Sequence, residues 1–213
     1  TLTFQPGGFL QNYNISPGIL MLVFFMLIGA GAVKAGMMPF HGWLPSAMVA
    51  PTPVSALLHA VAVVKAGAFC CIRIMCYVYG PTLLADLPAN QIMGIISVFT
   101  IICASLIALG QDNLKRRLAY STVGQLSYVV LGTSMLSAAS LTGAMFHIVA
   151  HAVMKITLFM CAGAIIVTTH KNNVSEMRGI GRQMPITMGC YTIAALGIVG
   201  LPLTVGFQSK WNL

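Results

Sequence analysis

The strongest constraint in this sequence is the length of its uncharged apolar stretches. Residues 90–109, NQIMGIISVFTIICASLIAL, contain no charged side chain. A helix of about twenty residues is long enough to cross the ~30 Å hydrocarbon core of a bilayer. Over the whole chain 58% of residues are hydrophobic and only 7% are charged, whereas about 25% are charged in ordinary soluble domains. We therefore interpret the chain as an integral membrane protein.

Helices are the expected spanning structure, because lipid offers no partners for backbone N–H and C=O groups. A β-barrel would alternate polar and apolar residues over about ten positions, and the sequence has no such alternation. It predicts an all-α integral membrane protein with about six transmembrane helices. These spans form one transmembrane region over residues 1–213, at residues 17–48, 53–79, 90–109, 116–137, 141–168 and 186–213. The chain is expected to be an internal piece of a longer polypeptide.

Basic residues concentrate in two connecting segments, with three in residues 110–117 and three in residues 169–185. Two crossings separate these loops, so both are expected on one side, which the positive-inside rule makes cytoplasmic. We expect a multi-pass protein of the inner (cytoplasmic) membrane. The net charge of +8 is assigned to this topology and to buried lysines, and no nucleic-acid partner is expected.

The six cysteines give no sign of a metal or redox site. They lie in or beside apolar spans, without a CxxC pair or a Cys/His cluster at zinc spacing. We interpret them as small packing residues. No metal, no cofactor and no catalytic centre are expected in this chain.

Ionisable residues inside the spans are the candidate functional groups. Lys34, Lys65 and Lys155 lie among apolar neighbours, and Lys210 lies in the last, interrupted span. A lysine at mid-membrane costs ~2.5–3.5 kcal/mol of insertion free energy, and none of the three acidic residues lies at mid-span to neutralise these amines. A buried lysine can lower this cost by releasing its proton. Lysines that exchange protons in this way indicate a proton relay.

Two histidines extend this pattern in the fifth span. His147, His151 and Lys155 follow one another at intervals of four residues, which places them along one helix face with a rise of ~12 Å. Histidine suits proton transfer, because one ring nitrogen accepts while the other donates. In the second span His59 and Lys65 lie roughly 120° apart around a regular helix, so sharing a face would require a π-bulge or a curved water path.

Structural roles remain open for several polar residues. His59 could be a hydrogen-bond partner between helices, and Lys210 could extend to the membrane interface. His41 and His170 fall in loops, where solvation is the default. Five polar residues of the fourth span are interpreted as interhelical hydrogen-bonding groups: Ser121, Thr122, Gln125, Ser127 and Tyr128.

Glycines and prolines interrupt the first and last spans. Lys34 precedes a Gly/Pro-containing stretch at residues 36–45, and Lys210 follows one at residues 200–206. Broken helices are tolerated at membrane depth where they are buried or line a water-filled cavity, and paired breaks in transporters indicate the ion site. We predict discontinuous helices near Lys34 and Lys210.

Four segments carry a family resemblance: KAGMMPFHGWLPSAMVAPTPVSALLHAVAVVKAGAF, DNLKRRLAYSTVGQLSYVVLG, FHIVAHAVMKITLF and GLPLTVGFQSK. They resemble successive blocks of the antiporter-like subunits shared by respiratory complex I, Mrp-type cation/proton antiporters and membrane-bound hydrogenases. The resemblance extends from Val33 to Lys210. It implies a larger helical bundle built from two inverted repeats, each with a broken helix, of which this chain covers the end of one repeat and most of the other.

The resemblance also implies roles in the first half of the chain. Lys34 matches the broken-helix lysine that pairs with a glutamate on an earlier helix, so an upstream segment or chain is expected to supply that acid. Lys65 resembles the central channel lysine, and His59 resembles the channel histidine before it. Lys34 would then modulate the charge of Lys65. Ser46 replaces the aspartate common in the WLPDA form of the motif.

The second half carries the remaining implied roles. His147, His151 and Lys155 resemble the central relay of the family, and Lys210 resembles the lysine of the second broken helix near the proton exit. Gln208 replaces the second phenylalanine of the GFFSK form.

These observations predict proton translocation, possibly coupled to Na⁺, through a lysine/histidine relay. The chain would act in a complex of the NADH:quinone oxidoreductase-like, Mrp antiporter or hydrogenase type, beside other membrane subunits and lipid. Whether that complex is an enzyme is left open. Two alternatives remain: a non-conducting scaffold, or a coupling subunit for a soluble partner enzyme such as an inorganic-carbon uptake system.

Overall fold

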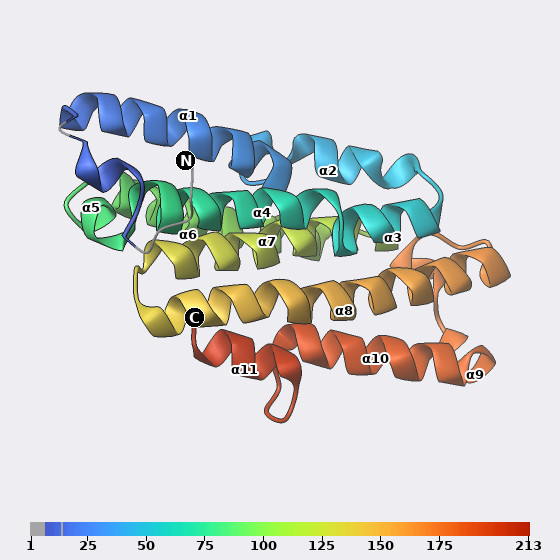
Figure 1. The fold of residues 1–213 in the computed structure, drawn as a ribbon. Helices are drawn as coiled ribbons and strands as arrows, with labels where there is room; N and C mark the ends of the chain where they lie inside the picture. Colours follow the sequence, from blue (N-terminus) through green and yellow to red (C-terminus); the bar gives the residue numbers. More distant parts are fainter. Residues whose placement is uncertain (1–6, 14) are drawn as a thin grey trace.

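The computed structural model describes residues 7–13 and 15–213, and every regular element in that part is a helix. The long helices run antiparallel to their chain neighbours and lie side by side in one bundle (Figure 1). The described residues contain no β-strand, and their only β-type pairing is an isolated antiparallel bridge between Asn113 and Asn173. The predicted all-α fold class is confirmed.

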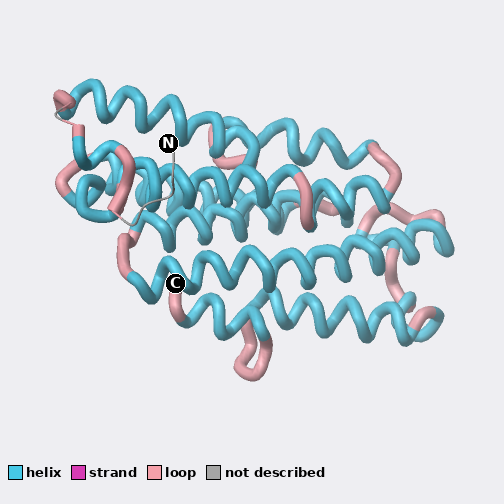
Figure 2. The backbone as a smooth tube through the Cα atoms, viewed as in Figure 1, coloured by secondary structure: helices cyan, strands magenta, loops and turns pink. Residues whose placement is uncertain are grey.

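The first half of the chain consists of interrupted helices. Its elements are η1 (Leu10–Asn12), α1 (Pro17–Ala35), η2 (Phe40–Gly42), α2 (Trp43–Ser46), η3 (Ala47–Val49), α3 (Thr52–Ala60), α4 (Val63–Arg73), the π-helix η4 (Ile74–Tyr79) and α5 (Pro81–Ala85). The second half contains α6 (Ala89–Gly110), α7 (Leu114–Ser134), α8 (Ala138–Thr169), η5 (Val174–Glu176), α9 (Ile180–Gln183), α10 (Pro185–Val199) and α11 (Val205–Trp211). Non-helical residues separate α1 from α2, α3 from α4 and α10 from α11, whereas α8 runs through without a break (Figure 2).

Local sequence signals explain where several helices begin. Pro17 and Pro185 occupy first-turn positions of α1 and α10, where a missing N–H costs nothing. Asn113 caps α7, since its side-chain oxygen accepts from the Arg116 N–H at 3.1 Å. Ser137 caps α8 in the same way. Each cap satisfies an N–H group that the helix leaves free at its start.

Both predicted discontinuous helices are present. In the first, α1 ends with Gly36 as its C-cap (φ 74°), and in the second, α10 ends with Gly200 as its C-cap (φ 87°). Both glycines are in a left-handed conformation, which glycine adopts without steric cost. A third break, absent from the sequence prediction, separates α3 from α4 at Val61, where φ is −127°. No glycine or proline marks that position.

Four helical stretches among the described residues are long and apolar enough to cross a membrane: Pro17–Val49, Thr52–Tyr79, Ala89–Gly110 and Ala138–Thr169. Together they make the chain a multi-pass membrane protein. The remaining two predicted spans correspond to α7 and to the broken pair α10 and α11. The count of six transmembrane helices and the extent of the single transmembrane region, residues 1–213, stay predictions.

Helix α8 lies at the centre of the second half, where it packs against α3, α7, α10 and α11. On the outside, α1 and α6 expose large apolar side chains such as Leu22 (62% exposed) and Ile95 (70% exposed). The buried polar and charged residues, by contrast, include members of α3, α4 and α8. An apolar exterior around a basic interior is the arrangement expected of a protein surrounded by lipid.

The two basic loops, residues 110–117 and 169–185, lie against each other at one end of the bundle. Leu114 N donates to Asn172 O at 3.0 Å, and Val174 N donates to Asp112 O at 2.8 Å. Both loops therefore lie on the same side, as their sequence positions indicate.

Candidate functional site

The central feature is a row of basic side chains on the inner face of α8. His147, His151 and Lys155 each have 0% of their surface exposed. The four-residue spacing thus produces one buried face, directed at the neighbouring helices. The three acidic residues all lie outside the long helices: Asp86 caps the end of α5, Asp112 lies in a loop and Glu176 ends η5.

Lys65 joins this face to the break between α3 and α4. Its Nζ donates to the carbonyl oxygen of His59 at 2.8 Å and lies 2.7 Å from His151 Nδ1. His59 is in the last turn of α3, where carbonyl groups lack partners within the helix. The break therefore lets one amine contact a helix end and a histidine of α8 together, which a regular helix could not arrange.

His147 makes the equivalent contact with the break between α10 and α11. Its Nδ1 lies 2.8 Å from Ser209 Oγ, on α11, and its Nε2 lies 3.1 Å from Gln125 Oε1, on α7. His147 thus connects three helices through two neutral side chains. The interpretation of Gln125 as an interhelical hydrogen-bonding group agrees with this contact.

The two predicted site lysines of the second half, Lys155 and Lys210, donate to backbone carbonyls. Lys155 Nζ donates to Leu118 O on α7 at 2.9 Å. Lys210 Nζ donates to Ile198 O at 2.5 Å and to Val199 O at 3.3 Å. A cation at these last carbonyls of α10 is stabilised by the negative end of the helix dipole.

The row on α8 is divided into separate hydrogen-bonded groups. The rings of His147 and His151 stack with centroids 5.9 Å apart, without a direct hydrogen bond between them. His151 Nε2 has no partner among the described residues, nor does either ring nitrogen of His59, which stacks on Phe159. The structure therefore brings the predicted residues together without connecting them into one continuous chain of hydrogen bonds.

Lys34 is not part of these groups. Its side chain is exposed, although its backbone lies where α1 crosses α4. A Cβ at Gly67 would lie 2.7 Å from the Lys34 carbonyl carbon, so only glycine allows this close crossing. The structure gives no contact between the side chains of Lys34 and Lys65, and the acidic partner of Lys34 stays a prediction.

Sequence reasoning missed Ser209 and the break at Val61. Ser209 immediately precedes Lys210, and nothing in its type separates it from the many other serines of the spans. Its contact depends on how α11 is oriented after the loop at residues 200–204. That orientation is set by packing and not by local sequence.

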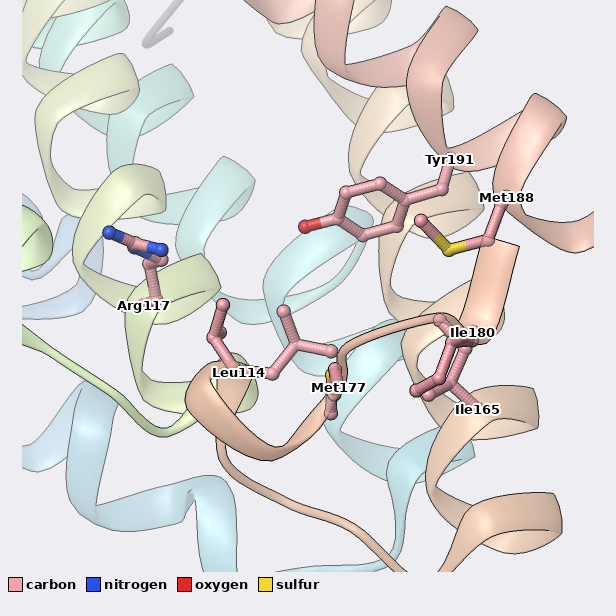
Figure 3. Close-up of a pocket in the computed structure, with 8 residues that line it drawn as sticks. Leu114, Arg117, Ile165, Met177, Ile180, Met188 and Tyr191 are labelled. Carbon is pink, nitrogen blue, oxygen red and sulfur yellow. The ribbon is translucent and has the colours of Figure 1, made fainter. Parts of the chain in front are cut away.

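A pocket of about 310 Å³ lies at the loop end of the bundle (Figure 3). Its lining is mainly apolar, with Arg117 and Tyr191 as the polar members. Arg117 is already engaged, because its Nε and Nη2 donate to Ala108 O and Leu109 O at the end of α6. None of the predicted site residues lines this pocket, so it is separate from the basic row.

Comparison with known proteins places the chain in a family. Residues 5–213 match the family described as NADH:quinone oxidoreductase/Mrp antiporter, transmembrane region. The chain belongs to this antiporter-like family. It is 39% identical over 202 residues to NADH-quinone oxidoreductase subunit N of Desulforudis audaxviator, a match that covers 93% of this chain and 39% of that protein.

Two solved complexes contain chains of similar structure. The Mrp complex from Dietzia sp. matches with a TM-score of 0.84 and 34% identity, over 92% of this chain and 21% of the other. The membrane-bound sulfane sulfur reductase, an archaeal respiratory membrane complex, matches with a TM-score of 0.86 and 29% identity, over 95% and 41%. This antiporter-like chain thus spans less than half the length of these relatives.

Proposed function

We propose that this chain is a proton-translocating part of an antiporter-like subunit, in which lysines are switchable proton carriers and histidines link them. The observation that carries the proposal is the contact between Lys65 Nζ and His151 Nδ1 at 2.7 Å. It joins two buried bases from different helices, with no carboxylate between them. A purely structural lysine would be satisfied by a backbone carbonyl or an acid, whereas Lys65 contacts a second base in addition to the His59 carbonyl.

This contact supports proton exchange in both directions. A charged Lys65 donates one hydrogen to His59 O and another to a bare His151 Nδ1. If the second hydrogen transfers, Lys65 becomes a neutral amine that accepts from Nδ1–H and still donates to His59 O. His151, now carrying a proton on each nitrogen, can release one from Nε2 on the other side of its ring.

The remaining steps require motion or water. His151 and His147 stack without a hydrogen bond, and Lys155 and Lys210 donate to carbonyls, which do not carry protons. We propose that protons cross these gaps when side chains turn or when water enters between them. The order of the groups would run from Lys65 through the row on α8 to Lys210.

The setting is also a proposal. Relatives named as subunits of an NADH-quinone oxidoreductase and the chains of an Mrp complex support a place beside other membrane subunits. An upstream acid would pair with Lys34, and the basic loops would face the cytoplasm across an inner membrane. Energy would come from a partner reaction, as the similarity to a sulfane sulfur reductase suggests, or from coupled Na⁺ movement.

The test is Lys65→Ala in the intact parent complex, reconstituted in liposomes with a pH-sensitive dye inside. General acid–base groups typically contribute about 10²–10⁴-fold in rate, so proton transport should fall at least about a hundredfold while the complex still assembles. Lys171→Ala removes an exposed loop lysine and should leave transport unchanged. Undiminished transport in an assembled Lys65→Ala complex would support the scaffold alternative instead.

A further inference from the structure

Ser209 occupies an unusual position at the second helix break. It is completely buried, and its Oγ lies 2.8 Å from His147 Nδ1 and 3.0 Å from the Gly206 carbonyl oxygen. A hydroxyl group has one hydrogen to donate. Ser209 can therefore donate to the histidine or to the carbonyl, but not fully to both.

The second partner of His147, Gln125, decides which ring nitrogen carries the hydrogen. Nε2 lies 3.1 Å from Gln125 Oε1, and an amide oxygen only accepts. With the Gln125 amide in this orientation, the hydrogen of a neutral His147 is on Nε2, and Nδ1 is bare. In this state Ser209 donates to Nδ1, and the Gly206 carbonyl lacks the Ser209 hydrogen bond.

Protonation of His147 reverses the Ser209 hydrogen bond. The added proton occupies Nδ1, the ring nitrogen without a hydrogen, and Nδ1–H then donates to Ser209 Oγ. The Ser209 hydrogen turns to the Gly206 carbonyl. The net change is one proton on His147, while Ser209 keeps one hydrogen throughout.

The Gly206 carbonyl lies beside the side chain of Lys210. A Cβ at Gly200 would be 3.2 Å from Lys210 Cδ and 3.6 Å from Gly206 O, so these groups share one small volume at the end of α10. Lys210 Nζ donates to Ile198 O in the same place. A change in the hydrogen bonding of Gly206 therefore occurs next to the lysine of the break.

We infer that Ser209 is a positioning residue whose hydroxyl turns between His147 Nδ1 and the Gly206 carbonyl, and so transmits the charge state of His147 to the α10–α11 break. The inference rests on the proposed function, because it needs His147 to gain and lose protons. In this inference the neutral side chain of Ser209 connects α8 with Lys210.

The experiment uses Ser209→Ala in the intact complex, reconstituted in liposomes. Loss of this one hydrogen bond should reduce proton transport about tenfold, with normal assembly. Ser105→Ala is the matched control, since it removes a serine hydroxyl that donates only to Ile101 O within α6, and transport should be unchanged. If the alanine variant assembles poorly, Ser209→Cys, which has a weak S–H donor, provides the same test.

Two further readouts distinguish this role from packing. The double variant His147→Gln with Ser209→Ala should transport no less than His147→Gln alone, because Ser209 acts through the histidine. The ¹⁵N NMR signal of His147 Nδ1 should move toward that of a nitrogen without a hydrogen bond in Ser209→Ala, and not in the control. Additive losses, or an unchanged Nδ1 signal, would overturn the inference.

The result for Lys65→Ala separates the two proposals. If Lys65→Ala transports normally, the relay itself is wrong. If Lys65→Ala stops transport while Ser209→Ala transports at the normal rate, the relay stands and only the role of Ser209 is wrong.

Discussion

The two helix breaks that face α8 solve the same problem with different side chains. At the break between α3 and α4, Lys65 alone contacts both the helix end and a histidine of α8. At the break between α10 and α11 the two contacts are divided, since Ser209 contacts His147 and Lys210 contacts the end of α10. The α3–α4 break places the amine of Lys65 directly against His151. The second inserts a neutral hydroxyl between the histidine and the charge.

The division at the second break depends on a very close approach of backbones. A Cβ at Gly206 would collide with the carbonyl oxygen of Gly197 on α10. The first break needs no such glycine between α3 and α4, and its residues Val61 and Ala62 have ordinary side chains. The second break is therefore the one that a single added methyl group should disturb.

Gly206→Ala is expected to have the largest effect on stability. The new methyl meets backbone, which cannot turn away, so α11 must shift and the complex should lose about 3 kcal/mol of stability, at the upper end of ordinary overpacking costs. The measurement is thermal unfolding of the purified complex. Gly189→Ala on α10, where nothing lies near the added Cβ, should be neutral or slightly stabilising. Equal melting temperatures for both variants would contradict the close packing at the second break.

A pair of double-mutant cycles compares the two junctions directly. Hydrogen bonds that involve a charged partner are roughly twice as strong as neutral ones. The cycle of Lys65→Met with His151→Phe should give a coupling energy of about 2 kcal/mol, and that of Ser209→Ala with His147→Phe about 1 kcal/mol. Both are measured from unfolding of the assembled complex. A larger coupling at Ser209 would reverse the comparison.

The sequence predicted the α10–α11 break better than the α3–α4 break. The four-residue spacing from His147 to Lys155 fixed a common helix face, and the stretches at residues 36–45 and 200–206 showed where two helices break. The contact of Lys65 with His151 was hidden, because Val61 breaks its helix without a glycine or proline. Ser209 was hidden as well, because its partner is 62 positions away and the tilt of α11 decides the contact.

The smallest expected effect on stability is at the loop end of the bundle. A variant there also tests whether the proposed relay extends as far as the loops. Ser175 donates to both carboxylate oxygens of Asp112, through N at 3.0 Å and Oγ at 2.7 Å, and these hydrogen bonds hold the Asp112 pKa below its usual value. A pKa that is lower in the folded state adds stability above the unfolded pKa of about 3.9, and this stability is lost as the pH falls through the folded value.

Ser175→Ala should therefore cause a small decrease in melting temperature at pH 7 that diminishes in acid below about pH 4. Proton transport should not change, because both loops lie outside the basic row. Thr168→Ala, which removes an exposed hydroxyl bonded within α8, controls for the loss of a side-chain oxygen and should show no such dependence on pH. A decrease in transport in Ser175→Ala would extend the functional region beyond the two breaks, since the connection between the loops would then act on α7 and α8 together.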